Sequence, residues 1–287
     1  MSRIAYVNGR FSALSDAAVH IEDRGYQLAD GVYEVWSVMD GRLADAEGHF
    51  ARLDRSLGEL QITPPMDRRA LTVILRETVR RNRVREGLLY LQITRGVARR
   101  DHAFPSPDTP PAMVVTCRSV DRAAAETKAA AGVSAFSQPE SRWARCDIKS
   151  IALLPNVLAK QASKMRGGYE AVFVDDLGLV TESASSNVWI VDADGVLRTR
   201  DTQANILRGI TRSTLMDVVA SEKMKVEERA FTLEEMHGAR EAFVTGAGAL
   251  IMPVVSLDGR PIGDGTPGPV AKRLRALYIQ KARETAC

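Results

Sequence analysis

Short strands separated by tight turns fill residues 170–199, and no other part of the sequence constrains the fold as strongly. The apolar segments in this region are too short for helices, and turn residues such as Asp194-Gly195 separate them. The expected strands are 170–175, 179–182, 187–191 and 196–199. This meander predicts that the second half of the chain is rich in β-structure.

The first half combines strands with two amphipathic helices. Glycine-containing pairs at positions 8–9 and 40–41 predict hairpin turns. Apolar side chains at helical spacing predict helices over 46–61 and 67–83. Elsewhere, strands are expected at 4–11, 31–39, 88–94, 113–117, 241–245 and 252–257, and helices at 156–165 and 213–221. The fold class is therefore α+β, or mixed α/β, in two parts.

The expected boundary between the two parts is Ala-rich and charged. Residues 1–120 are expected to form a small N-terminal α/β domain, and residues 134–287 a larger C-terminal domain that contains Lys149. Residues 121–133 are interpreted as the linker, with a short helix as the alternative.

Composition excludes several classes of protein. The chain has 287 residues, 45% of them hydrophobic and 26% charged, which is typical of a globular protein with one large domain or two ordinary ones. Its net charge of +3 is too small to imply a polyanionic partner. Cys117, Cys146 and Cys287 are far apart, so neither a disulfide framework nor a metal site is expected. These features favour a cytoplasmic protein without a signal peptide or membrane span.

A basic run at Arg80, Arg81, Arg83 and Arg85 leaves one remote alternative, a nucleic-acid-binding protein. No aromatic residues alternate with these arginines, and cations are favoured at a helix C-terminus. The run is therefore interpreted as a solvated helix end.

The stretch from Arg142 to Met165 is centred on Lys149, with Ile148 before it and an apolar run at 151–154 after it. A lysine held against apolar surface gives up its proton more readily, and the neutral amine is both a nucleophile and a base. Imine chemistry needs such an amine. The simpler alternative is a lysine that reaches solvent from a strand end.

Two motifs downstream suit a phosphorylated ring compound. Glu182 ends a strand before the loop S-A-S-S, where an acid could hold a protonated ring nitrogen. The sequence Gly209-Ile210-Thr211 precedes a helix, and its N–H groups and hydroxyl could hold a phosphate. A solvated glutamate and an ordinary helix N-cap are the alternatives.

A long Pro-rich loop between two expected strands carries Arg100 and His102. Loops of this length in compact proteins are usually functional or disordered. A guanidinium and an imidazole two residues apart can serve one carboxylate, although an exposed charged loop is the alternative.

Four motifs resemble, in the same order, the signatures of fold-type-IV pyridoxal-phosphate aminotransferases. They are R-G-Y-Q-L-A-D-G-V-Y-E-V, C-D-I-K-S-I-A-L-L-P-N-V-L-A-K-Q, T-E-S-A-S-S-N-V and I-L-R-G-I-T-R. The likeness is strongest to the D-amino-acid transaminases and covers nearly the whole chain. It implies a small α/β sandwich followed by a larger β-rich pseudo-barrel domain, with the cofactor between them. It also implies pyridoxal 5'-phosphate as cofactor, with pyridoxamine 5'-phosphate as its intermediate form.

The same resemblance implies roles for individual residues. Lys149 matches the lysine that forms the internal aldimine and then moves the substrate proton. Glu182 matches the acid at the pyridine nitrogen. The residues that match phosphate ligands are Arg52, Ile210 and Thr211, beside Gly209. The remaining residues expected near the cofactor are Ser185, Ser186, Gly246 and Ala247.

Tyr33, Arg100 and His102 match the residues that hold the substrate α-carboxylate in D-amino-acid transaminases. In that family the loop with the arginine and histidine reaches in from the partner subunit, so a homodimer is expected. Only one face of the substrate presents its Cα–H to Lys149, and the position of the carboxylate therefore selects the enantiomer. The Arg-x-His pair favours D-amino acids.

The resemblance thus implies ping-pong transamination between a D-amino acid, such as D-alanine, and a 2-oxo acid, such as pyruvate or 2-oxoglutarate. The alternatives within the fold are a branched-chain L-aminotransferase, an (R)-amine transaminase and an aminodeoxychorismate lyase. The chain departs from the family at T-G-A-G-A, residues 245–249, where hydroxyl residues are common. The backbone N–H of Ala247 is then the expected phosphate donor there.

Overall fold

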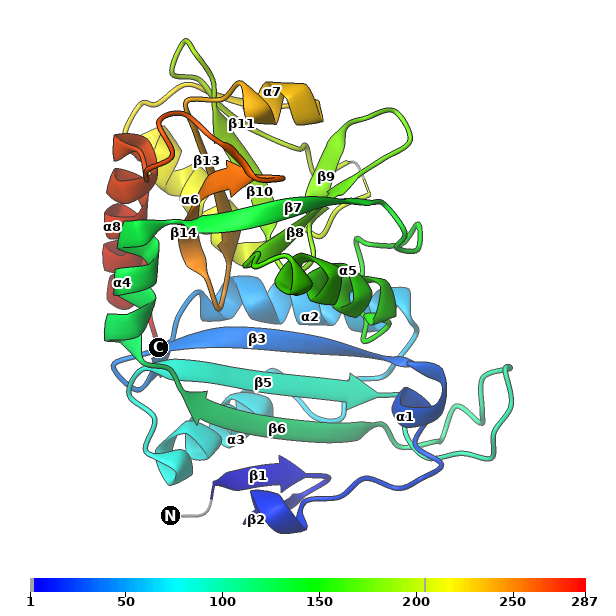
Figure 1. Cartoon of the computed structure of the whole chain (residues 1–287). Coiled ribbons are helices and arrows are strands. Elements are labelled where there is room, and N and C mark those ends of the chain that lie inside the picture. Colours follow the sequence, from blue (N-terminus) through cyan, green and yellow to red (C-terminus); the bar gives the residue numbers. More distant parts are fainter. Residues whose placement is uncertain (1–2, 204) are drawn as a thin grey trace. The chain divides into compact units, whose positions relative to one another are not determined.

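The computed structural model describes residues 3–203 and 205–287, and the chain divides into two compact units (Figure 1). The first unit comprises the described residues up to Asp121 together with Ile148–Ala152 and Thr285–Cys287. The second comprises Arg122–Asp147 and Leu153–Glu284. Both units mix helices and strands, which confirms the expected α+β class.

The first unit is built on a six-stranded antiparallel sheet with the order β2-β1-β6-β5-β3-β4 (Figure 1). Its long central strands are β3 (Gly31–Met39), β5 (Gly87–Thr94) and β6 (Ala112–Ser119). Its shorter strands are β1 (Ile4–Val7), β2 (Arg10–Ala13) and β4 (Arg42–Leu43). A short helix, α1 (Arg24–Leu28), and a 3-10 turn, η1 (Leu14–Asp16), lie between β2 and β3 in the sequence.

Two helices share a core with one face of this sheet, α2 (Ala46–Glu59) and α3 (Arg68–Asn82). Successive side chains of β3 point to opposite faces, so Val32 and Trp36 join this core while Tyr33 points the other way. Asp67 explains where α3 begins, because its carboxylate accepts a hydrogen bond from the N–H of Ala70 at 2.8 Å.

The segment Ile148–Ala152 belongs to the first unit because it pairs with the start of β3. The N–H of Tyr33 donates to the carbonyl of Lys149 at 3.0 Å, and the N–H of Ile151 donates to the carbonyl of Gly31 at 3.1 Å. A Cβ at position 31 would lie only 2.7 Å from the carbonyl oxygen of Ile93. Glycine is therefore needed where three backbone segments approach one another.

A buried polar cluster interrupts the apolar core of the first unit. Arg52 of α2 donates from Nε and Nη2 to the two carboxylate oxygens of Glu34, at 2.7 and 2.8 Å. His49 lies one helical turn earlier, and its Nδ1 is 2.7 Å from the same carboxylate. Because all three side chains are buried, each needs the others to replace lost water.

The second unit contains a nine-stranded mixed sheet with the order β12-β11-β10-β13-β14-β7-β8-β9, and β15 pairs with β14. The strands that precede α6 in the sequence are β7 (Val133–Pro139), β8 (Glu170–Val174), β9 (Val180–Ser183), β10 (Asn187–Val191) and β11 (Leu197–Thr199). The later strands are β12 (Val226–Glu228), β13 (Glu241–Gly246), β14 (Leu250–Leu257) and β15 (Arg260–Pro261). The last strand of the path, β9, also contacts β10, so the sheet curls back on itself as the expected pseudo-barrel.

The helices of the second unit are α4 (Arg122–Ala131), α5 (Leu154–Met165), α6 (Ile210–Ser221), α7 (Leu233–His237) and α8 (Pro269–Glu284). Helix α8 packs on strands β14 and β13 and on helix α6. Helix α4 also packs on β14, and helix α5 packs on β8 and β7. A hydrogen-bonded capping box formed by Thr232 and Glu235 starts α7.

Within the described ranges, no helix is both long enough and apolar enough to cross a membrane.

The domain boundaries expected from the sequence need correction. Residues 121–133 do not form a linker: most of them make up α4, which packs on β14 within the second unit. Lys149 lies in the first unit and not in the C-terminal part, because backbone pairing with β3 outweighs its position in the sequence. The sequence interpretation also omitted α8, although Ala271, Leu274 and Tyr278 recur at helical spacing on its buried side.

The buried Glu34 carboxylate predicts a specific loss of stability in acid. Burial raises its pKa, but the charges and hydrogen bonds of Arg52 and His49 outweigh that effect and lower the pKa to about 2, from an ordinary value of 4.5. The folded state therefore binds this proton less readily than the unfolded state. Ionised Glu34 therefore adds roughly 3 kcal/mol to the free energy of unfolding. This contribution is complete above pH 4.5 and is lost as the pH falls towards 2.

Carboxyl-carbon NMR should show Glu34 ionised down to about pH 3. Urea unfolding should show that this part of the acid dependence is missing in Glu34→Gln. A Glu34 carboxyl that titrates at its ordinary value would contradict the structure.

Candidate active site

Lys149 lies against an aromatic ring in the first unit. Its Nζ is 4.0 Å from the centroid of the Tyr33 ring, and Tyr33 stacks on Tyr90 with centroids 5.8 Å apart. Ile148 enters the core between sheet and helices, so alternation along the extended segment directs Lys149 to the opposite face. The structure thus brings together two residues that are far apart in the sequence.

The apolar surroundings expected for Lys149 are only partly present. Ile148 is buried, whereas Ile151 is half-buried and Leu154 is 68% exposed. The amine therefore contacts the Tyr33 ring, and not an aliphatic pocket made by the residues that follow it. Sequence adjacency misled here because the chain turns into α5 directly after the segment.

Three other candidate residues also belong to the first unit. Arg52 is 8% exposed and is oriented by the bidentate contact with Glu34. Arg100 and His102 both lie exposed on the loop between β5 and β6. This loop is ordered by contacts within the first unit, which include the Arg24 side chain and the carbonyl of Asp101 at 2.7 Å.

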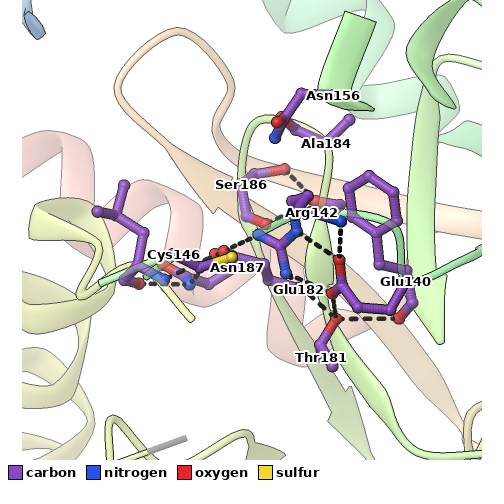
Figure 2. A network of polar contacts seen from close by, with 12 residues as sticks. Glu140, Arg142, Cys146, Asn156, Thr181, Glu182, Ala184, Ser186 and Asn187 are labelled. Carbon is purple, nitrogen blue, oxygen red and sulfur yellow. Dashed lines mark hydrogen bonds and ion pairs between the residues drawn. The ribbon is translucent and has the colours of Figure 1, made fainter. Parts of the chain in front are cut away.

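In the second unit, Glu182 is buried near the end of β9 and receives three hydrogen-bond donors (Figure 2). Oε1 accepts from Arg142 Nη1 and, at 3.1 Å, from the N–H of Leu207. Oε2 accepts from Asn187 Nδ2 at 3.1 Å. A carboxylate has about four acceptor positions, so these donors leave Oε2 able to accept one more hydrogen bond.

Arg142 serves two acids at once, as Figure 2 shows. It pairs with Glu182 and also with Glu140, whose Oε2 is 2.6 Å from Arg142 Nη2. Thr181 donates its hydroxyl to the same Glu140 oxygen at 2.7 Å. The cluster thus places one cation between two carboxylates.

The electrostatics of this cluster differ for the two acids. Burial raises the pKa of Glu182, and Arg142 and the Leu207 amide only partly offset that effect. Burial acts in the same direction on Glu140, but its hydrogen bonds and ion pair with Arg142 outweigh it and lower the pKa of that carboxyl. A buried acid that holds its proton more readily than usual is well suited to share a proton with a ring nitrogen.

The turn at Gly209 connects this acid to the start of α6. Asn187 donates from Nδ2 to both Glu182 and the carbonyl of Leu207, the latter at 3.0 Å. A Cβ at Gly209 would lie 2.0 Å from Asn187 Oδ1, so only glycine fits there. Gly209 is also the N-cap of α6 and has no side chain to bond the first N–H groups.

The helix start at Ile210 and Thr211 is therefore suited to an anion. Helix α6 has twelve residues, carries no acid in its first turn, and begins at Ile210. Its first N–H groups and its dipole favour negative charge, and Thr211 adds a buried hydroxyl. The sequence placed this helix three residues later, at 213, because glycine and threonine were interpreted as the residues before it.

The two loop serines have partners inside the protein. Ser185 and Ser186 donate their hydroxyls to Glu170 Oε2 at 2.8 and 3.1 Å, and Lys160 pairs with Oε1 of the same acid at 2.8 Å. Gly246 lies close to this loop, because a Cβ there would be 3.1 Å from the Ser185 carbonyl oxygen. The expected cofactor contacts of Ser185, Ser186, Gly246 and Ala247 stay predictions.

These residues fit a phosphorylated pyridine. The second unit offers an acid with remaining acceptor capacity, a helix start without a side-chain cap, and a glycine, Gly209, that lies too close to Asn187 to carry a Cβ. The first unit offers an amine on an aromatic ring and a buried, oriented arginine. Each unit by itself therefore carries residues of a kind that suits part of such a compound.

Sequence reasoning missed the residues that orient the candidates. These are Glu34 and His49 around Arg52, Arg142 and Asn187 around Glu182, and Glu170 around the serines. Two of them, Glu34 and Asn187, lie inside the motifs quoted above, so those motifs carried a signal. Arg142 carried none, because its pairing with Glu182 depends on the fold.

Comparison with known proteins adds independent information. The amino-transferase class IV family matches residues 31–257. The D-alanine aminotransferase of Bacillus licheniformis is 41% identical over 280 residues, which cover 97% of each chain. That of Staphylococcus haemolyticus is 38% identical over 271 residues, or 94% of each chain.

Solved structures agree on the fold. The T.th. branched-chain amino acid aminotransferase with pyridoxamine 5'-phosphate has a TM-score of 0.88 and 26% identity, and the match covers 98% of this chain and 94% of that one. The branched-chain enzyme of Escherichia coli has a TM-score of 0.89 at 22% identity, over 98% and 95% of the two chains, and supports the fold alone. On the family match and these relatives, the chain belongs to the class IV aminotransferases, the fold-type-IV group that depends on pyridoxal phosphate.

Proposed function

We propose that this protein transfers the amino group between a D-amino acid, such as D-alanine, and a 2-oxo acid, such as pyruvate or 2-oxoglutarate. The observation that carries the proposal is the contact between Lys149 and Tyr33, whose Nζ and ring centroid are 4.0 Å apart. It joins the residue expected to move the substrate proton to one expected to hold the substrate carboxylate. The similarity to D-alanine aminotransferases over nearly the full length supports it.

Pyridoxal phosphate, when bound, supplies an electron-withdrawing ring that makes the Cα–H of an attached amino acid acidic. The neutral Nζ of Lys149 would accept the Cα proton of the amino acid, hold it as an ammonium, and then give it back, so that the amine is free again afterwards. The Tyr33 ring holds that amine in one orientation. Oε2 of Glu182 would hold a proton at the ring nitrogen, while Arg142 and the Leu207 amide fix Oε1.

The phosphate would be held by charges and dipoles that the fold already orients. Arg52 is fixed by Glu34, and the N–H groups of Ile210 and Thr211 open α6. Ser185, Ser186, Gly246 and Ala247 would also contact the cofactor, and Glu170 holds the two serine hydroxyls. Pyridoxamine 5'-phosphate is then the form of the cofactor between the two half-reactions.

The substrate carboxylate would meet Tyr33, Arg100 and His102. Holding the carboxylate on that side turns the Cα–H of a D-amino acid, and not of its L-isomer, towards Lys149. This sets the proposal apart from a branched-chain L-aminotransferase. The structural relatives above are named as branched-chain amino acid aminotransferases. An (R)-amine transaminase would not need a carboxylate, and an aminodeoxychorismate lyase would release pyruvate without an amino acceptor.

The enantiomer decides between these functions. Purified holoenzyme should lose the visible absorbance of its bound cofactor on the order of a hundred times faster with D-alanine than with L-alanine. Adding pyruvate or 2-oxoglutarate should restore the absorbance.

Faster loss of absorbance with L-leucine than with any D-amino acid would contradict the proposal and favour the branched-chain alternative. Pyruvate release from aminodeoxychorismate, with no amino acceptor, would favour the lyase.

We also propose a homodimer in which the loop with Arg100 and His102 acts on the substrate of the partner subunit. Both side chains are exposed on the first unit. Helix α5 presents a stripe of exposed apolar side chains at Leu154, Val157 and Leu158, each more than half exposed. Apolar side chains three and four residues apart form one helix face, and such a face is typical of an interface.

Subunit complementation tests this arrangement. Lys149→Ala and Arg100→Met should each have low activity with D-alanine. If the loop acts on the partner, a dimer containing one copy of each variant has one site with Lys149 and Arg100 both intact. Mixed after unfolding and refolding together, the two should recover about a quarter of wild-type activity. No recovery from a mixture shown to contain the mixed dimer would contradict action across the subunits.

The remote nucleic-acid alternative gains no support from the basic run. Arg80 and Arg81 both pair with Glu77 one turn earlier on α3, at 2.6 and 2.7 Å. This is the solvated helix end expected from the sequence.

The structure describes Cys117, Cys146 and Cys287 as free thiols, and the cytoplasmic location stays a prediction.

A further inference from the structure

An aspartate whose side chain is 11% exposed contacts two arginines beside the loop that carries Arg100 and His102. Asp30 Oδ2 accepts from Arg24 Nε at 2.8 Å and from Arg95 Nε at 2.7 Å, and Oδ1 accepts from Arg95 Nη2 at 3.0 Å. Arg24 is 3% exposed and Arg95 is 8% exposed. We call these three residues the Asp30 cluster.

The cluster contacts the loop immediately around His102. Arg24 Nη1 donates to the carbonyl of Asp101 at 2.7 Å and to that of Ala103 at 3.2 Å. These are the residues before and after His102, and Asp101 also follows Arg100 directly. One guanidinium therefore fixes the backbone on both sides of the histidine.

The second arginine holds the next residue of the loop. The guanidinium carbon of Arg95 is 3.7 Å from the centroid of the Phe104 ring. Phe104 is 56% exposed, so little besides this contact covers the ring. The loop is thus attached to the Asp30 cluster at residues 101, 103 and 104.

The cluster also ties the loop to elements that carry other candidate residues. Arg95 donates from Nη1 to the carbonyl of Gln61 at 3.0 Å and from Nη2 to that of Leu60 at 2.7 Å, at the C-terminal end of α2. Helix α2 carries Arg52, and Asp30 directly precedes β3, which carries Tyr33.

Such attachment matters because the loop is long. Residues 95–111 connect β5 to β6 without a helix or strand among them. A free connection of this length has many conformations, and only one of them places its side chains to bind a carboxylate. Selecting that conformation costs entropy and weakens binding. Exposed contacts alone would not select one conformation, because surface ion pairs contribute little.

Arg24 and Arg95 make more contacts than are needed to neutralise Asp30. The cluster has two guanidinium groups and one carboxylate, and the surplus donors go to backbone carbonyls. Burial raises the pKa of Asp30, but hydrogen bonds and charge from Arg95 and Arg24 outweigh it and keep the pKa low. The acid therefore stays ionised and orients both arginines.

We propose that Arg24 is a positioning residue for substrate recognition, which holds Arg100 and His102 in the geometry that binds the α-carboxylate. This inference rests on the proposed function, since it concerns the same carboxylate. It assigns a role to a residue that contacts neither substrate nor cofactor. Phe104 acts in the same way through Arg95.

Kinetics with D-alanine test the proposal. Arg24→Met keeps the length of the side chain but removes its donors, and should raise KM about tenfold while kcat changes less than about twofold. Phe104→Ala should act in the same direction without disturbing a buried group. Arg80→Met is the matched control, because Arg80 is an exposed arginine of the same unit that pairs with Glu77, and its KM should equal that of the wild type.

A double-mutant cycle separates positioning from a general effect. If Arg24 acts through Arg100 and His102, adding Arg24→Met to the variant Arg100→Met/His102→Ala should leave its KM unchanged. A further rise in KM would overturn the proposal, because Arg24 would then act independently of Arg100 and His102.

Amide hydrogen exchange measures how firmly the loop is held, and it does not depend on the transamination reaction. The amides of Ala98 and Ala103 donate hydrogen bonds at 3.3 and 3.2 Å, and both should exchange at least about tenfold faster in Arg24→Met and in Phe104→Ala, while the amides of β3 and β5 keep their rates. Unchanged loop exchange in both variants would overturn the proposal even if KM rises. By contrast, an unaltered KM in Arg100→Met, with a loop that loosens as expected, would contradict the carboxylate role given under the proposed function and leave the anchor intact.

Discussion

The backbone pairing between the segment at Lys149 and the start of β3 is the interaction on which the candidate site depends. Two hydrogen bonds, from Tyr33 to Lys149 and from Ile151 to Gly31, join a sheet near the N-terminus to a segment from the middle of the chain. Alternation then sends Ile148 into the core and Lys149 onto Tyr33. Without this pairing, the amine would have no fixed partner.

Each unit contains a buried ion pair in which one charged residue orients a candidate cofactor ligand of opposite charge. In the first unit, Glu34 orients Arg52, the candidate phosphate ligand. In the second unit, Arg142 orients Glu182, the candidate partner of the ring nitrogen. A buried charge without its partner would be strongly destabilising, so each pair is present before any ligand arrives. In the Asp30 cluster, ion pairs likewise fix two arginines, and these arginines hold the loop with Arg100 and His102.

The sequence predicted the elements well and their assembly poorly. Strand β3 and helices α2 and α3 follow from hydrophobic periodicity and turn residues, and the observed limits agree within about two residues. Short motifs in the family's order indicate Lys149, Glu182 and the turn at Gly209, and the roles of these residues stay predictions. The unit to which Lys149 belongs could not be found in this way, because pairing with β3 is a long-range contact.

The orienting residues show the same limit. Arg142 is forty residues from Glu182 in the sequence, and Arg24 is even farther from the loop it holds. Arg142 lies outside the quoted motifs, and only its burial and its contacts distinguish it from a surface arginine. Arg24 lies inside the first motif, but the motif does not indicate which loop this residue contacts. The expected linker failed for a related reason: an Ala-rich, charged segment suits a helix as well as a linker, and packing on β14 decides for the helix.

The central claim is that Lys149 is the amine to which the cofactor attaches. The most direct measurement is reduction of the holoenzyme with borohydride, followed by trypsin digestion and mass spectrometry. The account predicts that the pyridoxyl mass is found on the peptide Cys146–Lys160, at Lys149, because the modified lysine is no longer cleaved. Attachment at Lys160 or any other lysine, with Lys149 unmodified, would contradict it.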